Sequence, residues 1–487
     1  MMAIEKRVPA GARLLALVAA AAVLSACAPR EWLFPKLGIE PPKFSDFPEG
    51  FEAPISNETE QPMGGFGGGG GGISRTPVIF VHGNTVSAAF WKPARAYFKE
   101  KGYTGDELWA PSYGWNSVRY LDSGDLSVPS LARFVSAVRT HIHETTGERV
   151  QQFDLIGHSL GVTLVRQWMK QDNAWHRVRR FIGVAGASDG VWTAWSDSRA
   201  QQRPVSHELF PGSPWLKQLS RGGETPGPTR YMMLYDGTGW ADVLFPRPNE
   251  HSGALEGAYN LPYNLEHDTW YDHLMLPRVP ATMDAMIDWL RQGRDAERGA
   301  EPPELRREGK HISPTQVGAE VRCEMDERYP DHDTAASDVW VLNAHRVTTC
   351  YAYHPRTGLA GPMQRYRYVP GYLPGEEPLT VTASLAEGAY EEPQTIRFET
   401  NDPKAFIVYN TSGSEPSTGS PLYTEPVYLP APVTVRAMAV APDGRTSEAI
   451  RVPIDISLEL VEATHTLHRQ FDPEVEVEYD GSRRKGN

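Results

Sequence analysis

The strongest constraint on the fold is a regular alternation of short apolar segments and amphipathic helical segments between residues 77 and about 295. The apolar segments have the length of strands, and the segments between them repeat apolar residues at helical spacing. In chain order they are PVIFVHG, PARAYFKEKGY, LARFVSAVRTHIHE, FDLIGHS with its following helix, RRFIGVAGA, RYMMLYDGTG and ATMDAMIDWLRQ. Strands that alternate with helices form a mostly parallel sheet covered on both faces. The sequence therefore predicts an α/β domain over residues 77–298.

The remaining chain has a different pattern, as expected for a protein of 487 residues, which is too long for one ordinary core. Residues 310–372 contain short β-like runs, and residues 376–456 alternate apolar and polar residues between Asp-Gly, Ser-Gly and Pro turns. We expect a small β module followed by a β-sandwich, and then a tail over residues 457–487. Residues 190–228 interrupt the α/β pattern, and we expect either a lid over the substrate or a plain surface excursion.

The first 27 residues have the layout of a secretory signal, with basic residues before the apolar run LLALVAAAAVLSAC. The end of this run, LSAC, resembles the lipobox of bacterial lipoproteins. The resemblance implies that residues 1–27 form a lipoprotein signal peptide, that Cys27 carries the lipid, and that the protein is anchored to the cell envelope, at the outer membrane or cell surface. An ordinary signal peptide cut elsewhere, or a short anchor, is the alternative.

Residues 28–76 follow this signal and are rich in Pro, Glu and Gly. They end in GGFGGGGGG, residues 64–72, so we predict a flexible tether between the anchor and the first strand. The alternative is a glycine run folded against the domain surface. The sequence does not separate the two.

If Cys27 carries lipid, the remaining cysteines are Cys323 and Cys350. In an oxidising compartment, two cysteines within one small segment are most simply a disulfide, which here would join the first and third β-like runs. Neither has the CxxC spacing of a metal site, and two thiols alone cannot complete a tetrahedral shell. We interpret the DHD at residues 331–333 as a solvated turn instead of a calcium loop, and expect no metal or organic cofactor.

The motif that carries chemistry is GHSLG, residues 157–161, at the junction of a predicted strand and helix. Its two glycines allow a tight turn that exposes the hydroxyl of Ser159 at the helix N-terminus, as the GxSxG nucleophile motif requires. A serine hydroxyl becomes a good nucleophile when a histidine accepts its proton and a carboxylate orients that histidine. Ser159 is the predicted nucleophile, and a structural turn serine is the alternative.

The partners of this serine should follow it in the chain. Among fifteen histidines, His267 comes after a strand-like segment and before the last helix, and it is the predicted base. His273, nearer to that helix, is the alternative, while His158 is interpreted as a packed neighbour of the serine. The acid is predicted to be Asp242, which follows a glycine turn; Asp236, at the end of a strand, is the alternative and is also easily explained as a turn-capping residue.

A tetrahedral intermediate also needs two backbone N–H donors for its oxyanion. One is expected from Leu160, directly after the nucleophile. The other is expected from Asn84, by its position in the loop that follows the first strand through His82 and Gly83. We interpret His82 as a structural histidine that shapes this loop.

The strand-HG loop, the GHSLG motif, the late Asp and His and the run SPWLKQLSRGGETPGPTRYMMLYD together resemble bacterial lipases and esterases of the α/β-hydrolase fold. The similarity, over about residues 77–292, is to triacylglycerol lipases and to the extracellular polyhydroxyalkanoate depolymerases related to them. One departure is the HG loop, which carries Asn-Thr in place of a glycine run. The resemblance implies these roles: nucleophile Ser159, acid Asp242, base His267, and oxyanion hole Asn84 and Leu160.

A second resemblance concerns the predicted β-sandwich. The runs NDPKAFIVYNTSGSEPSTGSPLYTEPVYL and VTVRAMAVAPDGRTSE are similar to the small C-terminal β-sandwich of chitobiases and many secreted bacterial enzymes. Such modules are usually accessory, so the resemblance implies a role in spacing, stability or surface contact and does not imply sugar hydrolysis.

These observations predict a surface-anchored serine hydrolase of carboxylic esters that acts on lipid esters or aliphatic polyesters through an acyl-enzyme. Amidases, thioesterases and acyltransferases use the same machinery. The alternative class is a non-enzymatic surface binding protein on the same scaffold, which a serine reagent would not label at Ser159. A net charge of −13, with no long basic run before the final SRRKG, argues against a nucleic-acid partner. The expected partners are the ester or polyester substrate and, through the lipid anchor, a membrane.

Overall fold

The protein is represented by a computed structural model. It describes the following residues: 45–57, 60–84, 86–113, 127–191, 205, 208–237, 242, 251–263 and 272–456. The predicted lipidation site Cys27, the tail and the predicted base His267 lie outside these residues. In the described part of the chain, no helix is long and apolar enough to cross a bilayer.

The first domain is built on a sheet of eight strands in the order β1-β2-β4-β3-β5-β6-β7-β8. From β4 to β8 along this order every neighbouring pair is parallel, whereas β2 runs antiparallel to β4. The predicted α/β-hydrolase fold with a parallel sheet is confirmed. The strands are β1 Ser45–Asp46, β2 Gly64–Gly67, β3 Val78–Val81, β4 Leu108–Ser112, β5 Phe153–His158, β6 Val178–Val184, β7 Arg230–Asp236 and β8 Tyr259–Tyr263.

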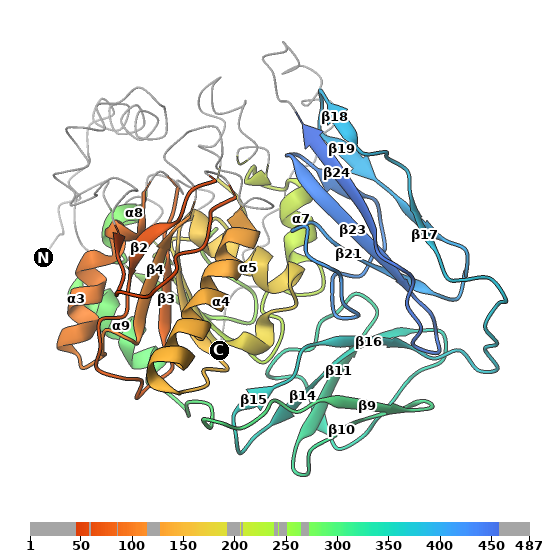
Figure 1. Cartoon of the computed structure of the whole chain (residues 1–487), viewed down its shortest axis with the longest axis horizontal. Coiled ribbons are helices and arrows are strands. Elements are labelled where there is room, and N and C mark those ends of the chain that lie inside the picture. Colours follow the sequence, from red (N-terminus) through yellow and green to blue (C-terminus); the bar gives the residue numbers. More distant parts are fainter. Residues whose placement is uncertain are drawn as a thin grey trace, which may run out of the picture.

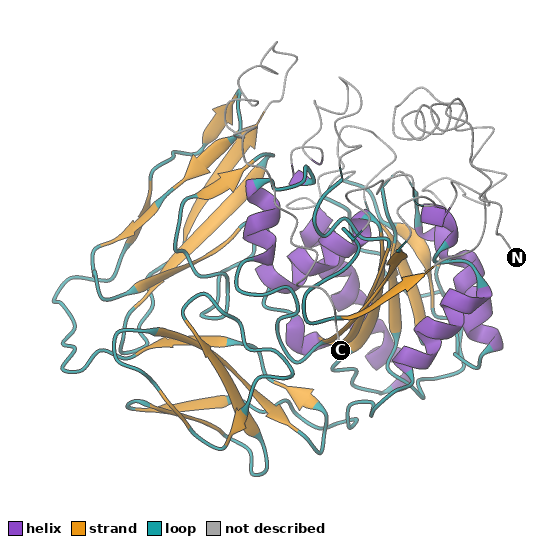
Figure 2. Cartoon of the chain, turned by 180° about the vertical axis from the view of Figure 1, so that it is seen from behind, coloured by secondary structure: helices purple, strands orange, loops and turns teal. Residues whose placement is uncertain are grey.

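Helices cover both faces of this sheet (Figures 1 and 2). Helices α3 and α9 contribute to the core on one face, and α4 and α5 to the core on the other. The helical segments are η1 Ala88–Trp91, α3 Lys92–Glu100, α4 Ser127–Thr146, α5 Leu160–Gln171, η2 Trp175–Arg177, α7 Pro214–Ser220, α8 Asp272–Met275 and α9 Pro280–Leu290.

Strand β3 shows how the sequence pattern produces two cores. Val78 and Phe80 belong to the core under α3 and α9, while Ile79 and Val81 belong to the core under α4 and α5. Successive side chains of a strand point to opposite faces, so a strand covered on both sides is apolar throughout. A continuous apolar run such as PVIFV therefore indicates a central strand.

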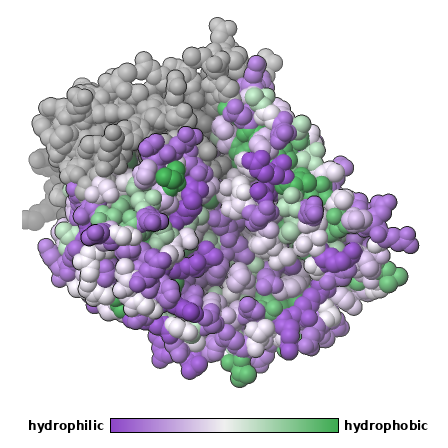
Figure 3. Space-filling view, in the orientation of Figure 1, coloured by the Kyte–Doolittle hydropathy of each residue, from purple (hydrophilic) through white to green (hydrophobic). Residues whose placement is uncertain are grey.

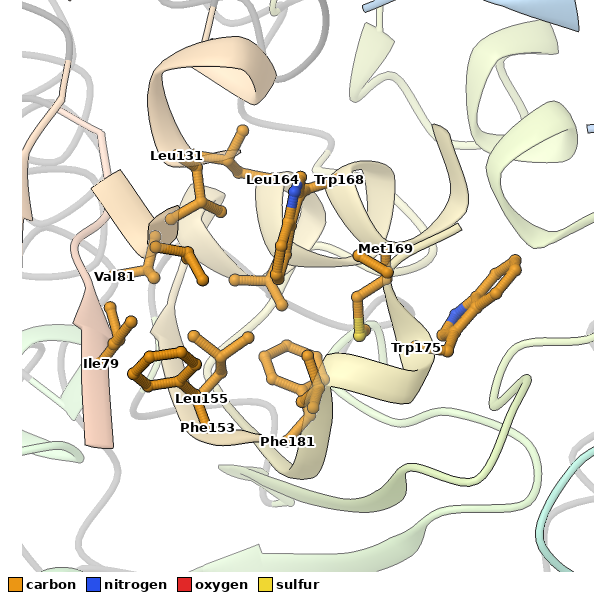
Figure 4. Close-up of a cluster of buried hydrophobic side chains, with 14 of the residues drawn as sticks. Ile79, Val81, Leu131, Phe153, Leu155, Leu164, Trp168, Met169, Trp175 and Phe181 are labelled. Carbon is orange, nitrogen blue, oxygen red and sulfur yellow. The ribbon is translucent and has the colours of Figure 1, made fainter. Parts of the chain in front are cut away.

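Helix α5 follows Ser159, the predicted nucleophile, and is enclosed on all sides. Leu164, Trp168 and Met169 lie at helical spacing and pack over strand residues such as Leu155 and Phe181 (Figure 4). Every residue of α5 is buried, including its polar ones. The outer face is buried because α4 and α7 pack against this helix.

Residues 64–72 differ from the predicted tether. Residues 64–67 form β2, which pairs with β4, and a Cβ added at Gly67 would lie 2.0 Å from the ring of Trp109. The amides of Gly70 and Gly72 donate to the carboxylate of Asp106 at 2.8 and 2.9 Å. The glycines here allow close approach of the backbone to the domain, which is the alternative that the composition left open.

The small β module contains two sheets. The first has the order β13-β10-β9, and in the second β11 and β14 pair centrally, with β12, β15 and β16 beside them. Cys323 of β11 lies opposite Cys350 of β14, and the two form a disulfide, as predicted. The strands are β9 Leu305–Glu308, β10 His311–Pro314, β11 Glu320–Met325, β12 Ala336–Ser337, β13 Trp340–Val341, β14 Val347–His354, β15 Leu359–Ala360 and β16 Gln364–Arg367.

The last β unit has a four-stranded sheet, β18-β24-β23-β21, and two pairs, β17-β20 and β19-β22. Inward side chains from all three sheets share one apolar core. Its strands are β17 Val381–Ala383, β18 Gly388–Tyr390, β19 Gln394–Ile396, β20 Phe398–Thr400, β21 Phe406–Asn410, β22 Val427–Leu429, β23 Val433–Val440 and β24 Ile450–Ile456.

Both β units lie beside the α/β domain and contact it directly (Figure 1). The side-chain amide of Asn410 donates to the carbonyl of Gln171 at 2.8 Å, and the hydroxyl of Ser412 donates to Asp172 at 2.9 Å. The end of α5 is thus bonded to the sandwich. The face of the molecule seen in Figure 3 is mainly hydrophilic over the described residues, with apolar residues scattered among them.

Candidate active site

Ser159 occupies a strained turn between β5 and α5. Its φ of 54° and ψ of −123° are unusual for a residue other than glycine, and they are the conformation that a nucleophile elbow imposes. Its hydroxyl makes no capping bond to α5, so capping does not occupy it. A Cβ added at Gly161 would lie 2.5 Å from the carbonyl oxygen of Val81, and one at Gly157 would lie 2.9 Å from that of Gly161. Both glycines of the motif are therefore required by close packing.

The carboxyl ends of the parallel strands bring the other predicted residues to this edge of the sheet. Asp242 follows β7, and His273 lies in α8, after β8. The Nδ1 of His273 is 2.8 Å from Oδ2 of Asp242, and both side chains are buried. His273 was the alternative base from the sequence. The structure places it at the predicted acid, whereas His267 lies outside the described residues.

Asp236 ends β7 and supports the backbone of Asp242, the predicted acid. Its Oδ2 accepts a 3.0 Å hydrogen bond from the backbone N–H of Asp242. Both carboxylates are almost fully buried, with exposed fractions of 4 % and 2 %. The sequence offered these residues as competing acids. In the structure Asp242 contacts the histidine, and Asp236 holds the backbone of Asp242.

The loop after β3 lies directly against Ser159, the predicted nucleophile. A Cβ added at Gly83 would be 2.8 Å from the Cβ of Ser159. The ring of His82 bonds the carbonyl oxygen of Gly83 through Nδ1, at 2.8 Å. Because a trans peptide is planar, the N–H of Asn84 points opposite to that bonded carbonyl. His82 thus orients the amide that the sequence predicts as an oxyanion donor.

His82 is kept neutral by its surroundings. Burial lowers its pKa from 6.5 to about 4, and its ring stacks on Tyr113 with 4.2 Å between centroids. The hydroxyl of Tyr113 donates to the carbonyl of His82. Tyr113 was not predicted to support this loop, because the contact joins the residues that directly follow β3 and β4 and has no local signal in the sequence. The second predicted donor, Leu160, is the first residue of α5, where helix N–H groups have no partner within the helix.

Other sequence features are structural. Trp91, Trp109 and Trp215 are buried in the two cores and so have packing roles. In the DHD segment, Asp331 accepts hydrogen bonds from the amides of Asp333 and Thr334, which is a turn. Among the described residues, no group of three or more His, Cys, Asp or Glu side chains could hold a metal ion.

Two segments of the chain match known families. Residues 75–235 match the lipase (class 2) family. This segment contains the strained turn of Ser159 and the loop of Asn84, and the class 2 lipase match supports an enzyme that hydrolyses ester bonds. Residues 385–451 match the chitobiase/beta-hexosaminidase C-terminal domain, in agreement with the resemblance of the sandwich. No curated protein sequence matches the chain.

Solved structures of lipases and esterases are similar to part of the chain. The mature lipase BlEst2 of Bacillus licheniformis is 19% identical and is matched over 45% of this chain and 92% of its own, with a TM-score of 0.33. The propeptide form of the same lipase is 14% identical and is matched over 80% of this chain and 95% of its own, with a TM-score of 0.35. The carboxylesterase CesB of Bacillus subtilis is 16% identical and is matched over 46% of this chain and 87% of its own, with a TM-score of 0.26.

Proposed function

We propose that this protein is a serine hydrolase that cleaves carboxylic esters, of lipids or of aliphatic polyesters, through an acyl-enzyme intermediate. The observation that carries the proposal is the 2.8 Å pair of His273 and Asp242 at the sheet edge that also bears the strained turn of Ser159. A buried carboxylate that accepts from Nδ1 selects the tautomer in which Nε2 of the same imidazole is the basic nitrogen. The class 2 lipase match supports ester bonds as the target.

The proposed mechanism assigns one task to each group. The hydroxyl of Ser159 attacks the ester carbonyl while His273 takes its proton. Asp242 stabilises the imidazolium, and His273 then gives the proton to the leaving alcohol. The amides of Asn84 and Leu160 bind the oxyanion of each tetrahedral intermediate. Water, activated by His273, releases the acid and restores the serine.

The polymer part of the proposal rests on the similarity of the sequence to lipases and to polyhydroxyalkanoate depolymerases. A deep lipase site and a polymer-degrading site differ in how much of the substrate they enclose. The catalytic residues named above do not distinguish the two classes of enzyme, so activity on each substrate must do so. Both lie within the same chemistry of acyl transfer.

Initial rates test the function. We would measure the purified protein lacking residues 1–27 on p-nitrophenyl esters of increasing acyl length, on emulsified triacylglycerol and on polyester particles, beside Ser159→Ala. We expect the wild-type protein to hydrolyse these esters and Ser159→Ala to lose this activity. An organophosphonate should label Ser159 in the wild-type protein. Equal rates for both proteins would overturn the proposal. Turnover of anilides in preference to esters would identify an amidase.

We also propose that the mature protein is a lipoprotein anchored at the cell envelope through Cys27. Support comes from the LSAC sequence and from the apolar run that precedes it. Metabolic labelling with a fatty acid, followed by separation of membrane and soluble fractions, tests this. Label and membrane association should both disappear in Cys27→Ser, and a labelled Cys27→Ser protein would contradict the proposal.

A further inference from the structure

His158, the last residue of β5 and the one before Ser159, has a side chain that the proposed reaction does not use. It is 1 % exposed, and its ring stacks on Phe90 with 4.7 Å between centroids at an interplanar angle of 19°. Its Nε2 lies 2.8 Å from the backbone carbonyl oxygen of His273, and the two imidazole centroids are 4.8 Å apart. The residue before the nucleophile thus contacts the residue that carries the base.

The hydrogen bond determines the tautomer of His158. A carbonyl oxygen only accepts, so Nε2 must carry the proton and donate it to His273. In the described part of the chain, Nδ1 of His158 has no hydrogen-bond partner, and the backbone of Gly83 closes over it: a Cβ added there would be 3.1 Å away. Burial, together with the nearby charges of His273 and Arg278, lowers the pKa of His158 well below 6.5. His158 is thus a neutral donor.

Phe90, which stacks on His158, also contacts Arg278, a residue that follows α8. The guanidinium of Arg278 lies over the ring of Phe90, 4.5 Å from its centroid, and donates to the carbonyl of Phe90 at 3.1 Å. Arg278 follows α8 closely in the chain. His158 and Arg278 therefore hold the segment around α8 from two points, both of which rest on Phe90.

Helix α8 has only the four residues Asp272–Met275. One helical turn contributes little stability of its own, because its formation orders several residues for very few hydrogen bonds. The position of His273 must therefore come from bonds to other elements, and the bond from His158 comes from the elbow itself.

We propose that His158 is a positioning residue that sets the place of the base relative to the nucleophile, by donating from Nε2 to the backbone of His273. This inference rests on the proposed function, because it assigns the base to His273. His158 itself touches neither substrate nor reacting atoms in this scheme. Its effect passes through the position that the imidazole of His273 takes beside Asp242.

The test compares His158→Gln with His158→Leu. The side-chain amide of glutamine reaches about as far as Nε2 of histidine and can donate to the same carbonyl, whereas leucine fills space without a donor. We expect His158→Leu to lower kcat about 100-fold with little change in KM, the size of loss that misplacement of a catalytic group causes. His158→Gln should recover most of this loss. The acid limb of the pH profile of kcat/KM should move in His158→Leu and stay in His158→Gln.

A matched control is His141→Leu. His141 is also a buried histidine, 8 % exposed, with ring contacts to Phe51 and Trp109, but it lies in α4 and away from the site. His141→Leu should leave kcat unchanged even if it lowers the unfolding free energy as much as His158→Leu does. Equal kcat in wild type and His158→Leu, or equal losses in His158→Leu and His158→Gln, would overturn the inference.

A second measurement keeps the inference separate from the proposed function. The proton between Nδ1 of His273 and Asp242 should give a low-field resonance in the proton NMR spectrum, independent of turnover. If wild type hydrolyses no ester, the proposed function fails. The inference about His158 then stands if this resonance is lost in His158→Leu and kept in His158→Gln, and falls if both variants keep it.

Discussion

His273 and Asp242, 31 residues apart in the chain, are joined by a 2.8 Å hydrogen bond between Nδ1 and Oδ2. Asp242 follows β7 and His273 follows β8, and these strands are parallel neighbours. Two segments that leave the same edge of adjacent strands meet above that edge. The bond therefore follows from the topology of the sheet.

The first prediction concerns the base. His273→Ala should lower kcat about 10⁴-fold, and Asp242→Asn by a similar amount, because both remove the oriented proton acceptor. The double variant should lose little more than either single one, since the residues act as a unit. Steady-state rates on a p-nitrophenyl ester check this. His267→Ala is the decisive comparison: if it is inactive while His273→Ala retains activity, the base is His267.

A second prediction separates the two buried aspartates. Asp236→Asn keeps an oxygen that can accept from the N–H of Asp242, so kcat should stay within a few fold of wild type. Asp236→Ala removes this acceptor, and we expect about a 10- to 100-fold loss of kcat from misplacement of Asp242. If Asp236→Asn instead costs as much as Asp242→Asn, then Asp236 is the acid and the assignment is reversed.

The sequence predicted the sheet and the tight turn at Ser159 because both depend on short-range patterns. Strand β3 and helix α5 have clear periods, and GHSLG is defined by the close packing of its glycines. The choice between His267 and His273 had no such pattern. Both histidines lie in the same short segment, and which one reaches Asp242 depends on the path of the chain in space.

The glycine run illustrates a different limit. A flexible linker and a strand that approaches another backbone closely both favour glycine, so composition alone cannot distinguish them. The deciding residue is Trp109, because its ring lies so close to Gly67 that a side chain at residue 67 would not fit. In the same way, the support that Tyr113 gives to His82 comes from the residue that follows a neighbouring strand, β4. Local sequence cannot reveal partners of this kind.

A third prediction concerns stability and pH. In the folded protein the pKa of His82 is lowered from 6.5 to about 4, so on acidification the unfolded chain binds this proton first. The stability that the neutral ring contributes is complete above pH 6.5 and is lost as the pH falls from 6.5 towards 4. His82→Gln should therefore reduce the slope of unfolding free energy against pH, between pH 6 and 5, by about 1.2 kcal/mol per pH unit. Urea unfolding at several pH values measures the slope. An unchanged slope would contradict the assignment of a neutral buried His82.

The last prediction concerns Asn173, which lies where the α/β domain contacts both β units. It follows α5 with a φ of 51°, a left-handed conformation that asparagine tolerates. Its side-chain amide donates to the carbonyl of Met363 at 2.8 Å and accepts from the N–H of the same residue at 3.2 Å. A Cβ added at Gly419, in the sandwich, would be 2.1 Å from its Nδ2, so both β units close on this one side chain.

Asn173→Gly keeps the backbone conformation and removes the two bonds, and it should lower the unfolding free energy by about 2 kcal/mol. Asn173→Ala also loses the favourable conformation and should cost about 1 kcal/mol more. Scanning calorimetry of the full chain gives both effects. The control is Asn401→Gly, which also removes two side-chain bonds to backbone groups, those of Thr380 and Pro378, but within the sandwich. We expect the transition of the α/β domain to separate from that of the sandwich in Asn173→Ala. A single transition at the wild-type temperature in both Asn173 variants would mean that this contact does not couple the domains.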